Sequence, residues 1–564
     1  MTDPLQIVAV SESQRTIPTT TQAFAAQRDT RRSVWLLLIV LLAAGTITLH
    51  GIHMSGDFGM HDEGTHVMTG VYFADLLTDF PVSHPVQYTY EFYARYSTLG
   101  LIHWPPFFPF VEGLAFRVFG PTVLAARITV LVFALLGLTF WFLLVRQLLG
   151  PQAAAFAALA LALLPSIVVY EQAVMLEIPS LALCIVAVYW WVQFLRTQRS
   201  RALAWFAITA SLAVLTKQHS IFLAPFCLLS AIAEGKWRSL FTRRRLMILA
   251  ASVLLLIPFY VLAVKVHLSS IADHVVTKHA WRLSGLLFYL RAVPREIGWP
   301  VLGLSLCGIA LSCWWGRRRD AAVMLSWILA CVLTFSFLNA REPRYFMYAL
   351  PPIVYFACWP FVIDFRDRRL RFVVCAASVI LLFTYLPADW HADYPSVYGY
   401  GDAVRGVVQG IPGREVLLFD GDDVDSTNVS FYLRRQDQQR RFVLFRKGLY
   451  ATRIMSMFGS TELVSNQSQL QGMLAAYGIK HVLIANETKQ HHPSEEVLRQ
   501  LLQTSQFKVI SKFPIVGNGS VHYLLLYENQ AASGPTQTEL RLPMMTLNHD
   551  IVVPLRLLGI QPAR

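Results

Sequence analysis

The sequence predicts a polytopic α-helical membrane protein with a C-terminal soluble α/β domain. Of its 564 residues, 55% are hydrophobic and only 15% are charged, whereas a soluble domain carries roughly a quarter charged residues. Apolar stretches recur at the ~20-residue length that a helix needs to cross the bilayer core. We therefore predict a polar N-terminal tail over residues 1–33, a membrane domain over 34–387 and a soluble domain over 388–564.

Eleven apolar stretches are predicted to cross the membrane. Those between residues 152 and 233 are short and can be divided in other ways. An odd number of crossings places the two ends of the membrane domain on opposite sides of the bilayer. The stretches lie near residues 34–52, 122–145, 152–169, 173–195, 202–216, 219–233, 246–264, 298–315, 321–338, 345–363 and 371–387.

The net charge of +13 would suggest a nucleic-acid partner in a soluble chain, but its placement argues for a membrane partner. Basic residues gather in every second connection, which by the positive-inside rule marks the cytoplasmic side. We therefore predict a multi-pass protein of the cytoplasmic (inner) membrane with a cytoplasmic N-terminus, a periplasmic C-terminal domain, contacts to membrane lipids and no nucleic-acid partner. The basic clusters are Arg28/Arg31/Arg32, Arg196/Arg199/Arg201, Lys236/Arg238 with Arg243–Arg245, Arg317–Arg319 and Arg366/Arg368/Arg369/Arg371.

One long outer loop, residues 53–121, is predicted to contain interfacial structure. Residues 66–79 have the pattern of an amphipathic helix suited to the membrane surface. An aromatic group of the kind found at headgroup level follows. Residues 103–120 are apolar but broken by prolines, which favours an interfacial or re-entrant helix over a crossing. The aromatic group is Tyr88, Tyr90, Phe92, Tyr93 and Tyr96.

The C-terminal region alternates strand and helix patterns, which is typical of a small α/β domain. Strands are predicted at 415–419, 481–485 and 521–527, and helices at 467–477 and 495–502. The Asp420-Gly421-Asp422-Asp423 segment follows the first strand. It could bind a cation, but a plain polar turn is favoured because Asp and Gly are common turn residues.

The adjacent pair Asp62-Glu63 is the most informative candidate site. It follows the first apolar span, and ionisable groups at the mouth of a membrane domain favour a functional interpretation; a solvated pair of loop acids is the alternative. Other charged residues also gather at the predicted outer ends of spans. For Lys217, snorkelling to the interface is an equally weighted alternative. The others are Arg127, Glu171, Glu177, Arg341, Glu342 and Arg344, with Tyr345 beside them.

If these charged residues line one cavity, that cavity would suit the transfer of a group from a lipid phosphate. Arginine and lysine bind phosphate, arginine in a bidentate manner. A neighbouring carboxylate can take the proton of an attacking hydroxyl or amine, and the cations can stabilise charge on the departing phosphate.

A metal site is a competing interpretation of the His61-Asp62-Glu63-Gly64-Thr65-His66 segment. The two histidines are five residues apart and do not share a helical face. The Glu63-x-x-His66 pattern is half of a carboxylate-bridged metal motif, which needs a second copy that the sequence lacks. A divalent cation held by Asp62 or Glu177 stays open as an alternative, because hard cations readily take carboxylates. No cofactor is otherwise expected.

The order of these motifs resembles the GT-C superfamily of membrane glycosyltransferases. The match covers roughly residues 34–387 and is closest to the branch that contains protein O-mannosyltransferases and bacterial lipid A aminoarabinose transferases. It rests on an outer Asp-Glu, a Pro-Pro run at 105–106, Met-Leu-Glu-Ile-Pro at 175–179, Leu-Thr-Lys at 215–217 and Arg-Glu-Pro-Arg-Tyr at 341–345.

The resemblance implies a GT-C-like fold of about eleven transmembrane helices and a polyprenyl-phosphate sugar donor, with inversion at the anomeric carbon. Asp62 would be the catalytic base and Glu63 its partner. The positions that match substrate-binding residues of the family are His103, Arg127, Glu177, Lys217 and Arg344. Arg341 and Tyr345, in the same segment as Arg344, are added as candidates. Arg127 is expected to pair with Glu63, and Lys217 and Arg344 to lie near the donor phosphate.

Two positions depart from the family pattern. His103-Trp104-Pro105-Pro106 stands where bacterial members often have Lys-Pro-Pro, so a phosphate-contacting lysine is either missing or replaced by His103. Glu177 stands where aspartate is usual, which lengthens that side chain by one methylene. The C-terminal region lacks the Cys-rich or repeat features of the eukaryotic mannosyltransferases, which favours a bacterial enzyme.

The sequence thus predicts a hexosyl- or pentosyltransferase that acts at the outer face of the membrane on a lipid, glycan or protein acceptor of the cell envelope. A transporter or flippase of lipid-linked sugars is the alternative. Transporters place charged groups near the bilayer midplane in repeated halves, and no repeat is visible. A sensor domain anchored by the membrane part is a third interpretation, which leaves the outer charges unexplained.

Overall fold

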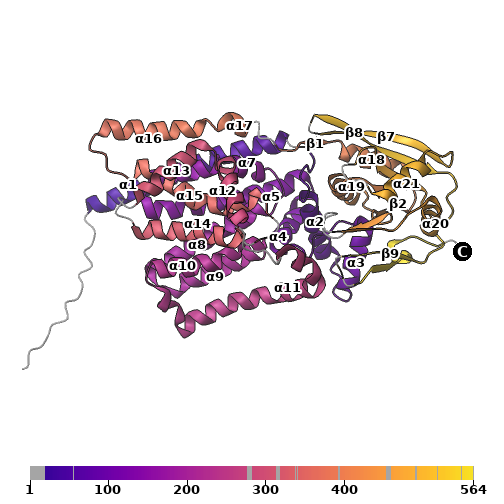
Figure 1. Ribbon diagram of the computed structural model, residues 1–564, viewed down its shortest axis with the longest axis horizontal. Helices are drawn as coiled ribbons and strands as arrows, with labels where there is room; N and C mark the ends of the chain where they lie inside the picture. The colour runs from indigo at the N-terminus through magenta and orange to yellow at the C-terminus, as the bar shows by residue number, and fades with distance from the viewer. Residues whose placement is uncertain are drawn as a thin grey trace, which may run out of the picture.

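The computed structural model describes residues 20–54, 56–275, 283–312, 318–336, 338, 341–390, 394–452, 459–488, 492–517, 519–545, 547 and 549–562. Residues 1–19 of the predicted tail and Arg317 of the predicted basic cluster lie outside this part. Figure 1 shows the long helices running along the length of the molecule, with the C-terminal strands gathered at one end. Helices α2 (Glu63–Asp79), α3 (Pro85–Tyr96) and α4 (Phe107–Phe119) lie between these two parts.

Each of the eleven predicted apolar stretches contains helix. The helices are α1 (Thr20–Met54), α5 (Val123–Leu149), α6 (Pro151–Ala162), α7 (Pro165–Glu171), α8 (Glu177–Thr197), α9 (Ser200–Val214), η1 (Gln218–Phe222), α10 (Leu223–Ala233), α11 (Arg243–Val275), α12 (Leu283–Ile297), α13 (Trp299–Leu311), α14 (Arg318–Ser336), η4 (Pro343–Ala349), α15 (Leu350–Ala357), α16 (Arg368–Phe383) and α17 (Leu386–Trp390).

The count of eleven crossings is not confirmed. Among the described residues, six helical segments are long and apolar enough to cross a membrane, and a seventh results if α6 and α7, bent by 66°, form one broken span. Helices such as α9, with 15 residues, extend only about 22 Å at 1.5 Å per residue, less than the ~30 Å hydrocarbon core. Prolines and short connections divide the remaining apolar sequence.

Helix α8 occupies the centre of the helical part. The most apolar stretch of α8 is 83% buried, compared with 6% for α11 and 17% for the α16–α17 segment. Figure 1 places α11 and α16 at opposite edges of the molecule. The first turn of α8, which begins with Glu177, is therefore surrounded by protein.

The described C-terminal region contains a six-stranded sheet in the order β1-β7-β8-β6-β2-β3. Strand β2 (Glu415–Asp420) pairs in parallel with β3 (Phe442–Phe445) and β6 (His481–Ala485), while β8 (Ser520–Asn529) pairs antiparallel with β6 and β7 (Phe507–Gly517). Strand β1 (Val397–Tyr398) completes the edge. The smaller ribbons are β4 (Tyr450–Thr452) with β5 (Ser460–Glu462) and β9 (Glu539–Leu542) with β10 (Ile551–Pro554).

Four helices pack with this sheet: α18 (Tyr400–Gly410), α19 (Asp423–Gln436), α20 (Gln467–Tyr477) and α21 (Pro493–Leu502). The predicted strands at 415–419, 481–485 and 521–527 correspond to β2, β6 and β8, and the predicted helices to α20 and α21. The acidic segment after β2 begins α19, where Asp422 and Asp425 form a capping box. This is the favoured polar-turn interpretation of that segment.

The outer loop differs from the prediction in how α2 is covered. The helix begins at Glu63, three residues before the predicted start, and its polar residues Glu63, His66, Thr69 and Asp75 are buried. Helix α4 packs against one side of α2, and α19 packs against another. The predicted helix is therefore present, but protein rather than solvent covers its polar residues; its position at the membrane surface stays a prediction.

Candidate active site

Asp62 lies at the N-terminal boundary of α2 and contacts a residue 282 positions away in sequence. Its Oδ2 accepts a hydrogen bond from Nη2 of Arg344 at 3.2 Å. The Asp62 side chain is 18% exposed and that of Arg344 is 14% exposed. The carboxylate is thus held by a cation and retains limited access to solvent.

Glu177 joins this pair to Lys217. Its Oε1 lies 3.2 Å from Nε of Arg344 and accepts a hydrogen bond from Nζ of Lys217 at 2.5 Å. The Glu177 side chain is fully buried, and that of Lys217 is 7% exposed. The structure therefore brings Asp62, Glu177, Lys217 and Arg344 into one charged cluster, as expected from the sequence. We call these four residues the charged cluster.

Local structure explains why these side chains meet. Glu177 is in the first turn of α8, where the helix dipole favours a carboxylate. Lys217 lies in the extended backbone between α9 and η1. Pro343 starts η4 and places Arg344 in its first turn. Each member therefore sits where a helix begins or is interrupted.

Tyr345 and Glu342 adjoin the charged cluster. The Tyr345 hydroxyl donates to Oε1 of Glu342 at 3.2 Å, and Nζ of Lys217 lies 5.7 Å from the centre of the Tyr345 ring. Glu342 also pairs with Arg344, with Nε at 2.6 Å from Oε2. Glu342 was noticed in the sequence only as part of a charged segment; its two contacts show its place beside the cluster.

Arg341 does not contact the charged cluster through its described hydrogen bonds. Its Nη1 donates to Oγ of Ser284 at 3.2 Å and its Nε to the carbonyl oxygen of Leu338 at 3.3 Å. The extended backbone of Glu342 separates it from Arg344. The prediction of Arg341 as a phosphate ligand therefore lacks support from the geometry.

Glu63 belongs to a second network that excludes solvent. Its side chain is 0% exposed to solvent, and Nε of Arg127 lies 3.5 Å from its Oε1. The amide of Val174 donates to Oε1 at 2.9 Å, and the hydroxyl of Tyr394 donates to Oε2. Protein groups occupy both of its oxygens, so these contacts do not support a catalytic role for Glu63, and that role stays a prediction.

Arg127 connects this network to the backbone before α2 and to Tyr394. Its guanidinium donates to the carbonyl oxygens of Gly56 and Asp57, both at 2.9 Å, and to the hydroxyl of Tyr394 at 2.9 Å. Its side chain is 1% exposed. The expected pairing with Glu63 is present, but direct binding of substrate by Arg127 is not supported, because these protein partners surround the guanidinium. We call Glu63, Arg127 and Tyr394 the buried network.

His103 contributes through its backbone next to Lys217. Its carbonyl oxygen accepts a hydrogen bond from Nε2 of Gln218 at 2.8 Å, and its ring packs edge-on against Trp104 with 4.5 Å between ring centres. These contacts place His103 near the start of η1. Its predicted role at the donor phosphate stays a prediction.

The side chains of the His61–His66 segment point to different partners. Nδ1 of His61 lies 3.3 Å from Asp423, and the ring of His66 packs edge-on against Trp104. Burial lowers the pKa of His66 to about 4, which keeps this side chain neutral. Within the described ranges no group of three or more His, Cys, Asp or Glu residues is placed to hold a metal ion. Asp62 and Glu177 share Arg344 rather than forming a cage of oxygen ligands.

The C-terminal region is attached directly to the segment that carries Asp62. Asn428 in α19 accepts from the amide of Phe58 at 3.1 Å and donates to its carbonyl oxygen at 2.8 Å. Oδ1 of Asp57 accepts from the hydroxyl of Tyr432 at 2.5 Å. A Cβ atom on Gly64 would lie 2.4 Å from Thr427, so glycine permits this close approach. Sequence patterns gave no signal for this contact.

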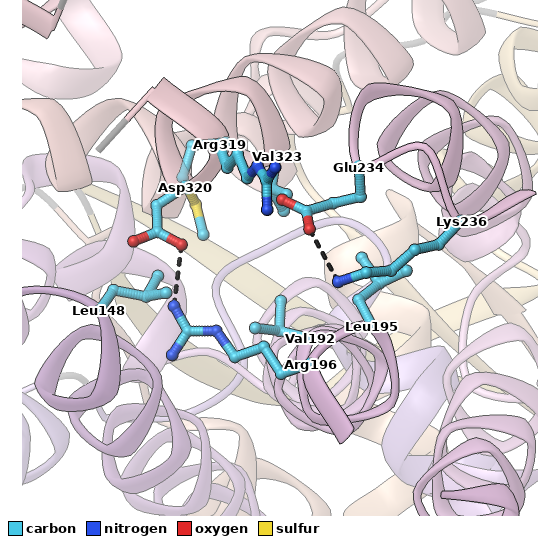
Figure 2. Close-up of a pocket in the computed structure, with 10 residues that line it drawn as sticks. Leu148, Val192, Leu195, Arg196, Glu234, Lys236, Arg319, Asp320 and Val323 are labelled. Atoms are coloured by element: carbon cyan, nitrogen blue, oxygen red, sulfur yellow. Dashed lines mark hydrogen bonds and ion pairs between the residues drawn. The ribbon is translucent and has the colours of Figure 1, made fainter. Parts of the chain in front are cut away.

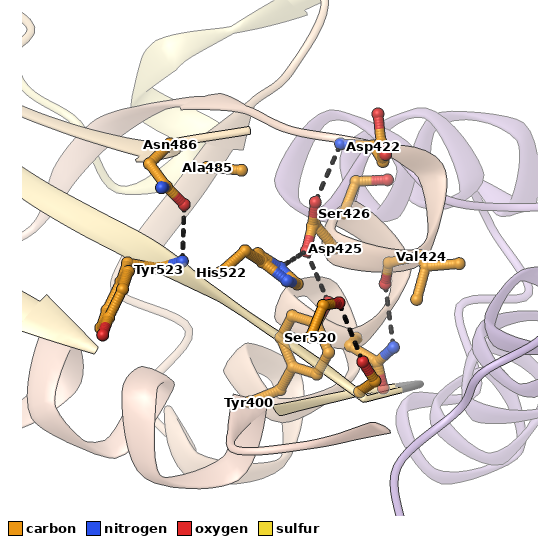
Figure 3. A network of polar contacts seen from close by, with 12 residues as sticks. Tyr400, Asp422, Val424, Asp425, Ser426, Ala485, Asn486, Ser520, His522 and Tyr523 are labelled. Atoms are coloured by element: carbon orange, nitrogen blue, oxygen red, sulfur yellow. Dashed lines mark hydrogen bonds and ion pairs between the residues drawn. The ribbon is translucent and has the colours of Figure 1, made fainter. Parts of the chain in front are cut away.

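Figure 3 shows how the start of α19 is connected to the sheet. Oδ1 of Asp425 accepts from the hydroxyl of Tyr400 at 2.5 Å and lies 2.9 Å from Nε2 of His522. The hydrogen bond to Asp425 raises the pKa of His522. These contacts fix the helix that carries Asn428 and Thr427 against α2.

Comparisons with known proteins agree with this architecture. The family model for dolichyl-phosphate-mannose-protein mannosyltransferases matches residues 103–263. ArnT from Cupriavidus metallidurans, in a crystal structure with bound undecaprenyl phosphate, superposes with a TM-score of 0.58 at 15% identity, covering 88% of this chain and 99% of that one. The chain has the fold of the GT-C membrane glycosyltransferases. The resemblance stated from the motifs is therefore confirmed.

Two further GT-C structures are similar in fold. The oligosaccharyltransferase from Archaeoglobus fulgidus, tethered to an acceptor peptide, gives a TM-score of 0.51 at 15% identity and covers 80% of this chain and 69% of that one. The arabinofuranosyltransferase AftD from Mycobacteria gives 0.54 at 14% identity over 89% of this chain and 40% of that one. No curated protein sequence matches the chain. The family-model match includes Arg127, Glu177 and Lys217 but ends before Arg344.

A cavity of about 240 Å³ lies far from the charged cluster. Figure 2 shows two ion pairs at this cavity: Arg196 with Asp320, at 2.8 Å, and Lys236 with Glu234, at 3.0 Å. Arg196 is in the last turn of the 21-residue α8, whose first residue is Glu177. At 1.5 Å per residue the two ends of α8 are about 30 Å apart. This cavity lies among the basic clusters at the opposite end of the spans.

Proposed function

We propose that the protein is a glycosyltransferase that moves a sugar from a polyprenyl-phosphate-linked donor to an acceptor of the cell envelope. The single observation that carries this proposal is the charged cluster, in which a partly exposed carboxylate lies beside two cations at one end of the spans. The GT-C fold and the undecaprenyl phosphate bound to ArnT support a polyprenyl-phosphate donor. The alternation of basic clusters along the sequence supports a site at the outer face of the cytoplasmic membrane.

Asp62 acts as the general base in this proposal. It takes the proton from the acceptor hydroxyl or amine as that atom forms a bond to the anomeric carbon. The bond between the anomeric carbon and the phosphate oxygen breaks, its electron pair leaves with the polyprenyl phosphate, and the anomeric centre is inverted. Inversion requires attack from the face of the sugar opposite the phosphate, so the hydrogen bond between Asp62 and Arg344 has to open when the donor binds.

Arg344 and Lys217 stabilise the negative charge on the departing phosphate, because cations fixed before the reaction need little reorganisation. Glu177 holds both cations through Oε1 and sets their spacing. The buried network positions the backbone before Asp62 and does not contact substrate.

The proposal is tested with full-length protein reconstituted in proteoliposomes and supplied with labelled polyprenyl-phosphate sugars. We expect release of polyprenyl phosphate that depends on acceptor, and co-purified polyprenyl phosphate in native mass spectra. Movement of the lipid across the bilayer without cleavage of the sugar–phosphate bond would instead support the flippase alternative and overturn the glycosyltransferase.

A further inference from the structure

Glu342 binds the cationic face of the site in the manner of a bound anion. Its Oε2 lies 2.6 Å from Nε of Arg344, and its Oε1 accepts from Nη2 of Arg344 at 2.9 Å. The hydroxyl of Tyr345 donates to the same Oε1 at 3.2 Å. Both carboxylate oxygens therefore lie beside one guanidinium: Oε1 accepts hydrogen bonds from Nη2 and from the phenol, and Oε2 forms an ion pair with Nε.

This set of donors suits a phosphate equally well. The side of a guanidinium presents two parallel N–H groups, and they match two oxygens of either a carboxylate or a phosphate. A tyrosine hydroxyl supplies a further hydrogen bond without charge. The position of the Glu342 carboxylate is thus a formed oxyanion site that a residue of the chain itself fills.

The charge balance indicates that an incoming phosphate would replace this carboxylate. Three carboxylates, from Asp62, Glu177 and Glu342, surround the two cations Arg344 and Lys217. A phosphate added to this group would bring a further negative charge next to all three. Removal of one carboxylate relieves that repulsion.

Glu342 is the carboxylate that can leave. Its side chain is 37% exposed, compared with 18% for Asp62 and 0% for Glu177. It precedes η4 in extended backbone, so its side chain can rotate toward solvent without disturbing a helix. Glu177, in contrast, is enclosed by Lys217 and Arg344.

We propose that Glu342 occupies the position of the donor phosphate and that the phosphate displaces it on binding. This inference rests on the proposed function and adds the location of the phosphate: between the side of the Arg344 guanidinium and the Tyr345 hydroxyl. Displacement frees two hydrogen-bond donors, Nη2 of Arg344 and the Tyr345 hydroxyl, and removes the carboxylate that pairs with Nε of Arg344. Donor binding thus exchanges one anion for another and leaves Glu177 in place. Glu342 is a specificity-determining residue here and not a base.

A purely local role is the competing explanation, since Glu342 is two residues from Arg344 and could serve to orient it. The two roles predict opposite effects on affinity. A displaced carboxylate weakens the binding of phosphate, so its removal strengthens binding. An orienting carboxylate assists binding, so its removal weakens it.

The test measures binding of undecaprenyl phosphate to the full-length protein in nanodiscs. We expect Glu342→Ala to bind about two- to tenfold more tightly than wild type, and Glu342→Gln to show a smaller gain, because exposed or half-exposed ion pairs compete only modestly. Added salt should reduce the difference between variant and wild type. Tyr345→Phe in the Glu342→Ala background should reverse part of the gain.

Two controls test whether the effect depends on the phosphate headgroup and on the location of the removed carboxylate. Undecaprenol, which has the same tail without phosphate, should bind wild type and Glu342→Ala equally. Asp402→Ala removes a carboxylate that pairs with Arg405 at 2.8 Å on the exposed side of α18 and should leave both affinities unchanged. Inorganic phosphate should compete more effectively against Glu342→Ala than against wild type, which separates headgroup recognition from the contribution of the lipid tail.

The outcomes separate this inference from the proposed function. Wild-type protein that binds undecaprenyl phosphate, together with a Glu342→Ala variant of equal or weaker affinity, overturns the inference and leaves the proposed donor standing. If wild-type protein binds undecaprenyl phosphate and undecaprenol equally well, both the inference and the proposed donor are overturned.

Discussion

The charged cluster and the buried network begin at neighbouring residues but treat their carboxylates differently. Asp62 is 18% exposed and contacts one nitrogen of Arg344, which also pairs with two other carboxylates. Glu63 is 0% exposed, and its oxygens accept hydrogen bonds from two separate segments, through the Val174 amide and the Tyr394 hydroxyl, with Arg127 beside it. One carboxylate can exchange partners, and the other cannot do so without exposing a buried cation.

This difference teaches that sequence adjacency does not give a shared role. The start of α2 directs Asp62 toward η4 and α8, while Glu63, as the first helical residue, faces α5 and the segment before α18. We therefore propose chemistry for the charged cluster and support of the backbone for the buried network. The following changes test this division.

Replacement of Asp62 by Asn should produce the largest effect. Loss of a general base costs about 10²–10⁴-fold in rate, while the similar shape of the amide preserves folding. The measurement is turnover in proteoliposomes alongside thermal unfolding. Asp402→Asn is the matched control and should keep normal turnover. Near-normal turnover of Asp62→Asn would remove Asp62 from its role.

Replacement of Arg127 by Met should primarily reduce stability. The change leaves Glu63 buried without its cation, and breaking a buried ion pair from one side costs about 3–5 kcal/mol. The measurement is unfolding in detergent monitored by intrinsic fluorescence. The double variant Arg127→Met with Glu63→Gln should recover part of the loss, because no charge then stays buried. A fully stable Arg127→Met protein with no activity would instead place Arg127 in the chemistry.

Asp420 extends the comparison to a buried carboxylate without a cation on it. Its Oδ2 has no hydrogen-bond partner in the described part of the chain, and burial raises the pKa of Asp420 to about 7. Since the folded protein holds this proton more tightly than the unfolded chain, the stabilising effect is complete below about pH 4 and is lost as the pH rises through 7. Asp420→Asn should therefore reduce the fall in Tm between pH 5 and pH 8.

The direction of this change is decisive. Neighbouring Glu495 and Asp422 raise the pKa of Asp420, and Arg499 and Arg446 lower it. Asp402→Asn, which leaves these groups in place, serves as the control. A wild-type Tm that rises between pH 5 and pH 8, with an unchanged rise in Asp420→Asn, would contradict the assignment of the buried proton to Asp420.

Replacement of Gly64 by Ala should have the smallest effect on stability and a distinct effect on the site. The added methyl would lie 2.4 Å from Thr427, and overpacking of this kind typically costs about 1–3 kcal/mol. Because α19 would have to move away from α2, turnover should fall together with stability. Thr427→Gly in the same chain should restore both. Failure of that second change to restore turnover would show that Gly64 acts through something other than space.

The helices of the membrane part and several C-terminal elements could be predicted from the sequence, because each depends on a local pattern of residues. Apolar length predicted helix in all eleven stretches, and alternating patterns predicted β2, β6 and β8. The predicted number of crossings, eleven, exceeds the six or seven described helical segments that are long enough to cross a membrane. Prolines and short connections divide the apolar sequence in ways that composition does not show. The signal for Asp62, Glu177, Lys217 and Arg344 was their shared position at the ends of spans.

The remaining features depend on contacts between distant segments. Tyr394 lies 331 residues from Glu63 and carries no local pattern that indicates the pairing. The contact of Asn428 with Phe58 and the close approach of Gly64 to Thr427 likewise join α19 to the outer loop. Arg341 and Arg344 have the same charge and nearly the same place in sequence, but the extended Glu342 and the start of η4 at Pro343 lie between them, and they contact different partners.

By itself the sequence determined that the protein is built from apolar helices, on which side its basic residues gather, and which ionised groups lie at the other side, because hydrophobic length and charge placement act residue by residue. Tertiary structure alone decided which of those groups meet. A carboxylate's role depends on the cations and hydrogen-bond donors that packing brings to it and on how much water is left, and these are properties of the folded neighbourhood rather than of the residue.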